Sequence, residues 1–182
     1  MKKIKNEKTK DIDEIILYDI NKDLCKAWEK YFKNISNVKI INCSFEELKS
    51  EYVVTAGNSY GWMTGGIDLV VRNYYKQEIQ DIIQQEILKS PGRYLPVGYN
   101  VVINTGDDLK PNLIYAPTMD VPKQIDALDV FYIFSRLLVE FKSFACCGLG
   151  TGMGKVSVDD CASAMYNAYC YIRGDKNASK KN

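Results

Sequence analysis

The chain has 182 residues, with 24 Lys and Arg against 23 Asp and Glu, a formal net charge of +1 and no histidine. This length suits one domain whose core needs neither disulfide nor metal for stability, and the charge balance argues against a protein that coats a polyanion. The absence of histidine excludes every mechanism that needs a histidine base.

The six cysteines include no Cys-x-x-Cys pair, so we expect free thiols, no metal and no cofactor. Free thiols are typical of a reducing compartment, and we expect a cytoplasmic protein. Apolar runs reach only four or five residues, and no apolar segment follows the Lys-rich residues 1–10, so we expect neither a membrane span nor a secretory signal.

Short apolar runs alternate with helical patterns, which predicts an α/β fold: three layers around a mostly parallel, mixed sheet. We expect six strands, at residues 14–18, 38–41, 52–55, 100–104, 113–116 and 144–147. We expect about five helices, one capped by Asn21, three at 66–74, 77–88 and 123–141, and one opened by Ser157 with Asp160 in a capping box. The predicted domain spans 11–173, between a basic extension at 1–10 and a disordered tail at 174–182.

Two predicted strands run directly into glycine-rich segments, at residues 55–68 and 147–155. Ligands of open α/β sheets bind beyond the carboxyl ends of the strands, and glycine lets successive backbone N–H groups approach an anion closely. Two such segments at neighbouring strands suit a diphosphate. The alternative is that each segment is only a tight turn between a strand and a helix.

The second segment is neither of the two common phosphate-binding fingerprints. Gly148, Gly150, Gly152 and Gly154 lack the spacing of the dinucleotide motif. Val156 follows Lys155 where the Walker A motif requires Ser or Thr.

Taken in order, the motifs of the chain resemble those of macro domains. Residues 52–59 (YVVTAGNS) resemble the signature strand that ends in Asn-Ala-Ala-Asn-Ser, and 65–68 (GGID) resemble its Gly-Gly-Val-Asp continuation. Asp68 lies ten positions after Asn58, the separation found in the mono-ADP-ribosyl hydrolase branch. Residues 95–98 and 114–117 resemble the middle segments of the family, and 150–152 (GTG) its second phosphate loop. The resemblance covers residues 38 to about 172.

The resemblance implies an ADP-ribose pocket. Asn58 would bind the distal ribose, the backbone of 65–67 and 150–153 would hold the diphosphate, and Asp68 would position or activate water. With the permuted arrangement described below, the predicted ligand-binding residues are Asp19, Ile20, Ser44, Ala56, Gly57, Asn58, Trp62, Gly65, Gly66, Ile67, Gly148, Leu149, Gly150, Thr151, Gly152 and Met153, with Asn58 and Asp68 as the predicted catalytic residues.

The chain departs from the family in two places that contact the ligand. Cys43-Ser44-Phe45 stands where members have Gly-Asp-Ile, whose aspartate binds the adenine amino group, so Ser44 lacks that charge. Met153-Gly154-Lys155 carries no aromatic ring to cover the distal ribose, a role that Trp62 or Tyr60 could take. Trp62 could equally anchor a partner protein, and Lys155 could pair with phosphate or remain solvated.

A third departure concerns the order of the elements. Family members continue after the last helix with a further strand and helix, whereas this chain carries an extra strand and helix at residues 14–35. We infer a circularly permuted arrangement, in which the N-terminal strand fills the vacant sheet position and stays parallel. Asp19 would then reach the adenine end and replace the missing acceptor. The alternative is a helix-capping or solvated carboxylate.

These observations predict an ADP-ribose-binding protein that hydrolyses ADP-ribosyl linkages, of the protein-linked or the 1″-phosphate type. Asp68 would serve as general base or water positioner, although an aspartate here could merely favour the helix dipole. The alternatives are a non-catalytic reader of ADP-ribose or a related NAD-derived nucleotide, and a pocket for another nucleotide or a nucleic-acid end. We expect a monomer whose partner is ADP-ribose or an ADP-ribosylated protein, with no strong signal for nucleic acid.

Overall fold

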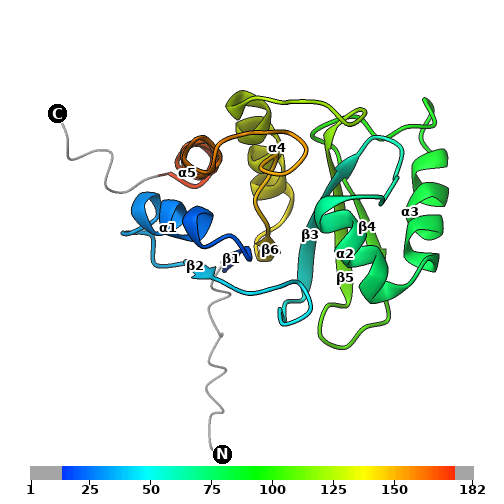
Figure 1. The fold of residues 1–182 in the computed structure, drawn as a ribbon, viewed down its shortest axis with the longest axis horizontal. Helices are drawn as coiled ribbons and strands as arrows, with labels where there is room; N and C mark the ends of the chain where they lie inside the picture. The colour runs from blue at the N-terminus through cyan, green and yellow to red at the C-terminus, as the bar shows by residue number, and fades with distance from the viewer. Residues whose placement is uncertain (1–13, 175–182) are drawn as a thin grey trace, which may run out of the picture.

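The computed structural model describes residues 14–174, which form six strands and five helices in one sheet and two helical layers (Figure 1). The strands are β1 (Ile15–Tyr18), β2 (Val38–Ile41), β3 (Tyr52–Asn58), β4 (Val101–Asn104), β5 (Asn112–Met119) and β6 (Phe144–Cys146). The helices are α1 (Lys22–Tyr31), α2 (Gly66–Tyr75), α3 (Glu78–Leu88), α4 (Ala127–Glu140) and α5 (Val158–Arg173). The predicted α/β class is confirmed.

The sheet has the order β2-β1-β6-β3-β5-β4, and every neighbouring pair is parallel except β4 with β5. The N-terminal strand β1 lies between β2 and β6 and is parallel to both, which meets the condition set by the permuted arrangement. Because β1, β6 and β3 run in the same direction side by side, the segments that follow them emerge at one edge of the sheet.

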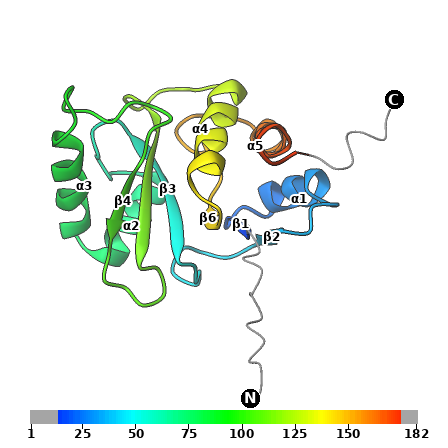
Figure 2. The same cartoon turned by 180° about the vertical axis from the view of Figure 1, so that it is seen from behind.

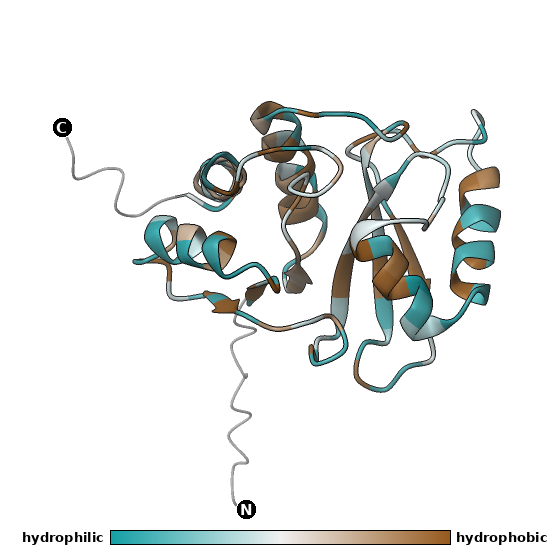
Figure 3. Cartoon of the chain, viewed as in Figure 1, coloured by the Kyte–Doolittle hydropathy of each residue, from teal (hydrophilic) through white to brown (hydrophobic). Residues whose placement is uncertain are grey.

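Helices cover both faces of the sheet, α1, α4 and α5 on one and α2 and α3 on the other (Figures 1 and 2). Strand side chains alternate between the two cores, so Leu17 packs toward α1 and α5, while Tyr18 packs on the opposite face. Apolar side chains of the helices face the sheet, and α1 and α3 show the complementary hydrophilic stretches (Figure 3).

Helix starts follow the predicted capping chemistry. Asn21 caps α1 by accepting hydrogen bonds from the backbone of Asp23 and Leu24, and Ser157 caps α5 through the N–H of Asp160. The predicted capping box at Ser157 is incomplete, because the Asp160 carboxylate accepts a hydrogen bond from the Ser157 hydroxyl and not from its backbone N–H. Helix α4 begins at Ala127, four residues later than predicted, because Asp126 forms a capping box with Asp129.

Strands β3 and β5 continue three residues past their predicted ends. They remain paired through Gly57 with Pro117 and Asn58 with Met119, with a register shift between Gly57 and Asn58. Gly57 and Pro117 interrupt the apolar pattern, which is why the sequence alone indicated an earlier end.

The predicted basic extension at 1–10 and all of the predicted tail after Gly174 lie outside the described residues. Between residues 14 and 174, none of the helices is both long enough and apolar enough to cross a membrane. None of the six cysteines, all of which lie among residues 14–174, forms a disulfide, as the sequence predicts.

Candidate functional site

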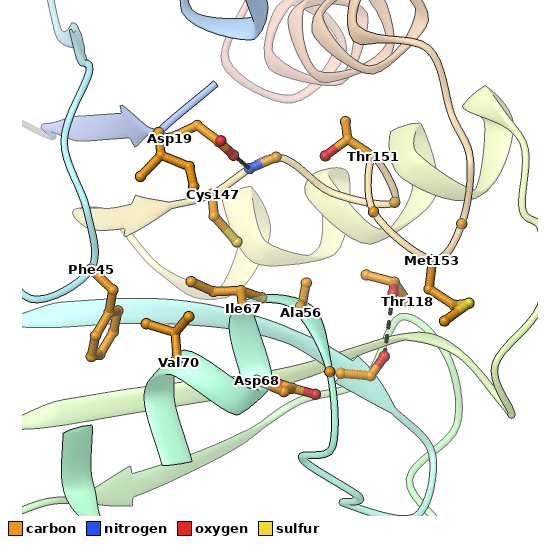
Figure 4. A pocket seen from close by; sticks show the side chains of 18 of the residues that line it. Asp19, Phe45, Ala56, Ile67, Asp68, Val70, Thr118, Cys147, Thr151 and Met153 are labelled. Atoms are coloured by element: carbon orange, nitrogen blue, oxygen red, sulfur yellow. Dashed lines mark hydrogen bonds between the residues drawn. The ribbon is translucent and has the colours of Figure 1, made fainter. Parts of the chain in front are cut away.

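A pocket of about 870 Å³ opens at the edge of the sheet where β1, β6 and β3 end. The glycine-rich segments after β3 and β6 form its two long walls, and the segments after β1 and β2 close one end. Figure 4 shows Thr151 and Met153 across the pocket from Ala56 and Ile67, with Asp19, Cys147 and Phe45 at the other end. The structure therefore brings together the two loops that the sequence singled out.

All but one of the predicted ligand-binding residues line this pocket. The exception is Leu149, whose side chain is fully buried in the core beneath α1, α4 and α5. Nothing in the sequence indicates that Leu149 differs from the neighbouring glycines and Thr151. In the structure those neighbours line the pocket, whereas Leu149 anchors the loop in the core.

Asn58 organises the first wall. Its side-chain oxygen accepts hydrogen bonds from the backbone N–H groups of Tyr60 at 3.1 Å and Trp62 at 3.3 Å, and its Nδ2 donates to the Trp62 carbonyl at 2.7 Å. One amide side chain thus folds residues 58–62 into a compact turn. Asn58 is itself largely buried, so most of its hydrogen-bonding capacity is committed to the loop.

A buried tyrosine fixes the backbone on which Asn58 sits. The Tyr115 hydroxyl accepts a hydrogen bond from the Asn58 N–H at 3.0 Å and donates one to the Asn58 carbonyl at 2.9 Å. A Cβ atom on Gly57 would lie 2.2 Å from the Tyr115 ring, so only glycine lets the ring reach this position. Burial is the main cause that raises the pKa of Tyr115, which keeps the hydroxyl protonated as a donor.

Helix α2 begins at the pocket. Its N-cap, Gly65, offers no side chain to the first backbone N–H groups, which have no partner within the helix. A Cβ atom on Gly65 or Gly66 would meet no atom within 4 Å, so the helix start faces open space. Such a start attracts anions through both its N–H groups and the helix dipole.

Asp68 lies in the first turn of α2 with its carboxylate toward the sheet, and it is 4% exposed. Its Oδ1 accepts a hydrogen bond of 2.7 Å from Thr55 Oγ1. Burial raises the pKa of Asp68 from 3.8 to about 7, and the Thr55 hydrogen bond opposes this shift only in part. Asp68 is therefore a buried acid that changes protonation near neutral pH and borders the pocket.

The second wall is a glycine loop folded on itself. The Val156 N–H donates to the Gly150 carbonyl at 3.1 Å, and the Ile125 N–H donates to the Gly154 carbonyl at 3.0 Å. Gly150 has a φ of 73°, a backbone conformation that residues with a side chain rarely adopt. A Cβ atom at this position would also lie 2.7 Å from the Ile125 side chain. The tip at Thr151 and Gly152 faces the pocket, whereas Lys155 is exposed and does not line it.

Asp19 joins the end of β1 to the second wall. Its Oδ1 accepts a hydrogen bond from the Asn21 N–H at 2.8 Å, and its Oδ2 accepts one from the Gly148 N–H at 3.2 Å (Figure 4). Ser44 lines the same end, beside Phe45 and Glu46. Asp19 thus borders the pocket and is held by two backbone N–H groups, and it does not cap α1, whose N-cap is Asn21.

Several residues that line the pocket were not among the predicted ligand-binding residues: Tyr18, Cys43, Phe45, Glu46, Thr64, Val70, Thr118, Met119, Pro122, Cys147 and Gly154. Most follow or end a strand at this edge, and that position is the signal that could have found them. The predicted strand ended at residue 116, so the sequence did not indicate that Thr118 and Met119 lie at the end of β5 and line the pocket.

The residues that line the pocket include three carboxylates, Asp19, Glu46 and Asp68, but neither Lys nor Arg. An anion here would depend on backbone N–H groups rather than on side-chain cations. Among residues 14–174, no group of three or more His, Cys, Asp or Glu is placed to hold a metal ion. Burial raises the pKa of the Cys147 thiol, so this pocket residue is a weak nucleophile.

Comparison with known proteins identifies the fold. No family model matches the chain. An uncharacterized protein of Aquifex aeolicus is 30% identical over 135 residues, which cover 71% of this chain and 78% of that protein. The macrodomain of Mycobacterium tuberculosis DarG superposes with a TM-score of 0.56 at 22% identity, over 69% of this chain and 84% of the other.

The structure of Thermosipho africanus DarTG in complex with ADP-ribose superposes with a TM-score of 0.57 at 14% identity, over 87% of this chain and 50% of the other. At 22% and 14% sequence identity, these two structural similarities show the fold alone. They agree with the motifs at residues 52–68 and 150–152. The chain has the fold of a macrodomain and belongs to the same family as the Aquifex aeolicus protein.

Proposed function

We propose that the pocket binds ADP-ribose, with the diphosphate between the start of α2 and the tip of the second loop. The observation that carries this proposal is that both walls turn glycine-flanked backbone toward one cavity (Figure 4). The chain also superposes on half of a DarTG structure that is in complex with ADP-ribose. In this placement the adenine lies toward Asp19 and Ser44, and the distal ribose toward Asn58 and Asp68.

Isothermal titration calorimetry with ADP-ribose tests the proposal. Gly152→Asp places a carboxylate where the diphosphate would lie, and a Cβ atom at Gly152 meets no atom within 4 Å, so the variant should fold. Gln77→Glu adds the same charge at an exposed position just before α3 and is the control. We expect binding by wild type and Gln77→Glu and none by Gly152→Asp. Equal binding by all three would refute this placement of the diphosphate.

We further propose that the protein hydrolyses an ADP-ribosyl linkage at the Asp68 end. With a pKa of about 7, the Asp68 carboxylate can accept a proton from an attacking water near neutral pH. The bond between the distal ribose and its leaving group then breaks, and the proton leaves with the released group or passes to solvent. The pocket walls would hold the ribose in place for this attack.

A non-catalytic reader is the second candidate function, and the burial of Asp68 favours it. Asp68 is 4% exposed, and its carboxylate already accepts a hydrogen bond from Thr55, so little of the carboxylate is accessible to an attacking water. Turnover assays with an ester-linked ADP-ribosyl protein and with ADP-ribose 1″-phosphate as substrates distinguish the two candidate functions. Hydrolysis is supported if wild type releases a free leaving group and Asp68→Asn does not, even though the variant still binds ADP-ribose. Binding without release from either substrate supports the reader.

A further inference from the structure

Strand β4 forms one edge of the sheet. It pairs with β5 alone, from Val101 with Tyr115 to Asn104 with Asn112. Among residues 14–174, the β4 backbone has no hydrogen-bond partner outside β5. In an antiparallel pair only alternate residues direct their N–H and C=O groups toward the neighbouring strand, so the remaining groups of β4 point away from β5. An edge of this kind is ready to pair with another strand.

The opposite edge of the sheet, β2, carries a residue of the kind that prevents such pairing. Lys39 is part of β2, and its ammonium group forms an ion pair with Glu14. A charged side chain on an edge strand, lysine above all, opposes pairing with a second chain. Residues 99–105 (YNVVINT) contain no charged residue, no proline and no glycine. Strand β4 therefore lacks the protection that β2 has.

The sequence around β4 matches itself when it is read in the antiparallel direction. With Val102 at the centre, Val101 corresponds to Ile103, and Asn100 corresponds to Asn104. Val101 and Ile103 pack in the core under α2 and α3, so Val102 points to the other face of the sheet. Two copies paired about a two-fold axis at Val102 would place aliphatic side chains opposite aliphatic ones and amides opposite amides. A symmetric interface requires this kind of self-complementary surface.

An apolar patch, which we call the edge patch, accompanies β4. It consists of two residues in or just before β4 and two residues of α4: Tyr99, Val102, Tyr132 and Val139. Their side chains are between 43% and 62% exposed. Tyr132 lies against the turn just before Tyr99, since a Cβ atom on Gly98 would be 2.3 Å from the Tyr132 ring. Val139 lies seven residues after Tyr132 and therefore on the same side of α4.

Two opposite charges lie beside the edge patch. The guanidinium group of Arg136 lies 5.4 Å from the centre of the Tyr99 ring, and it pairs with Glu140 at 2.8 Å. Glu140 also accepts a hydrogen bond from the side chain of Asn100, which ties α4 to the start of β4. Each copy would therefore bring one cation and one anion to a shared interface, so two copies approach without net repulsion between these groups.

We propose that a second copy of this chain pairs with β4 through its own β4, antiparallel and centred on Val102. The two six-stranded sheets then form one continuous sheet across a symmetric dimer. A stable interface buries about 800 Å² on each partner, more than one strand edge supplies, and the edge patch adds apolar area on α4. The sequence alone suggested a monomer because it does not show which strand forms the edge. No residue of the edge patch lines the pocket, so the dimer does not depend on the proposed function.

Sedimentation equilibrium between about 5 and 200 μM protein tests the dimer. We expect the mass of wild type to rise with concentration from 20.7 kDa toward twice that value. Val102→Lys places two like charges opposite each other at the axis and should weaken association at least about tenfold. Val121→Lys is the control, because it makes the same change outside the edge patch at a residue of similar exposure, 48% against 43%. Circular dichroism checks that both variants are folded.

Val102→Cys tests the register of the pairing. Directly opposite residues of an antiparallel pair have Cβ atoms about 4.5–5.5 Å apart, close to the distance that a disulfide spans, so mild oxidation with glutathione disulfide should link the two copies. Wild type, with its six native cysteines, and Val121→Cys measure the background. A wild type that stays monomeric at every concentration would overturn the proposal and leave this edge to a different partner. A dimer that Val102→Lys leaves unchanged, or cross-linking at residue 102 no greater than the background, would also overturn it.

Discussion

Replacement of Asp68 by Asn should stabilise the protein above neutral pH, and the size of the effect follows from its burial. Asn is isosteric and can still accept the Thr55 hydrogen bond, so the change removes only the capacity to ionise. The pKa of Asp68 rises from 3.8 to about 7 on burial, and a shift of this size corresponds to about 4 kcal/mol. We expect Asp68→Asn to be more stable than wild type by about 2–4 kcal/mol at pH 8.5.

The sign of the pH dependence follows from proton binding. Between about pH 4 and 7 the folded protein holds a proton on Asp68 that the unfolded chain has released. The free energy of unfolding of wild type should therefore fall as the pH rises through this window, relative to the variant, and level off above about pH 7. At pH 4 both proteins are neutral at this position, and their stabilities should agree within about 1 kcal/mol.

Urea denaturation of both proteins from pH 4 to pH 8.5 measures this difference. Asp81→Asn, at an exposed position on α3, controls for the loss of one carboxylate at the surface. A stability difference between Asp68→Asn and wild type that does not change with pH, or that favours wild type above pH 7, would contradict a buried Asp68 with a raised pKa.

Three further outcomes follow from the site. Asn58→Ala removes three hydrogen bonds from the turn and should weaken ADP-ribose binding at least about tenfold in calorimetry, whereas Asn58→Asp, which keeps the acceptor, should lose less. Gly57→Ala forces a Cβ atom into the Tyr115 ring and should lower the stability in urea by about 1–3 kcal/mol; an unchanged midpoint would disprove the contact. Because neither Lys nor Arg lines the pocket, ADP-ribose affinity should change less than about threefold between 50 and 300 mM NaCl, and a steep loss would reveal a side-chain cation at the diphosphate.

The sequence was sufficient for the layout of the fold because its signals are local. Apolar runs marked all six strands, and side-chain caps such as Asn21 and Ser157 marked helix starts. The two glycine-rich loops were predicted to share one pocket because parallel strands end at the same edge.

The same local signals could not predict contacts between segments that are far apart in the sequence. Nothing local to Gly57 shows that the Tyr115 ring, from another strand, fills the space of its missing side chain. The partner of Asp68 is Thr55, thirteen residues away on the strand, and the burial that raises its pKa comes from packing of α2 on the sheet.

A crystal structure with bound ADP-ribose tests the central claim most directly. We predict density for a diphosphate between the backbone of residues 65–67 and that of residues 150–153, with the base beside Asp19 and the distal ribose beside Asn58. Density for the ligand elsewhere on the surface, or an empty pocket at saturating ADP-ribose, would contradict the account.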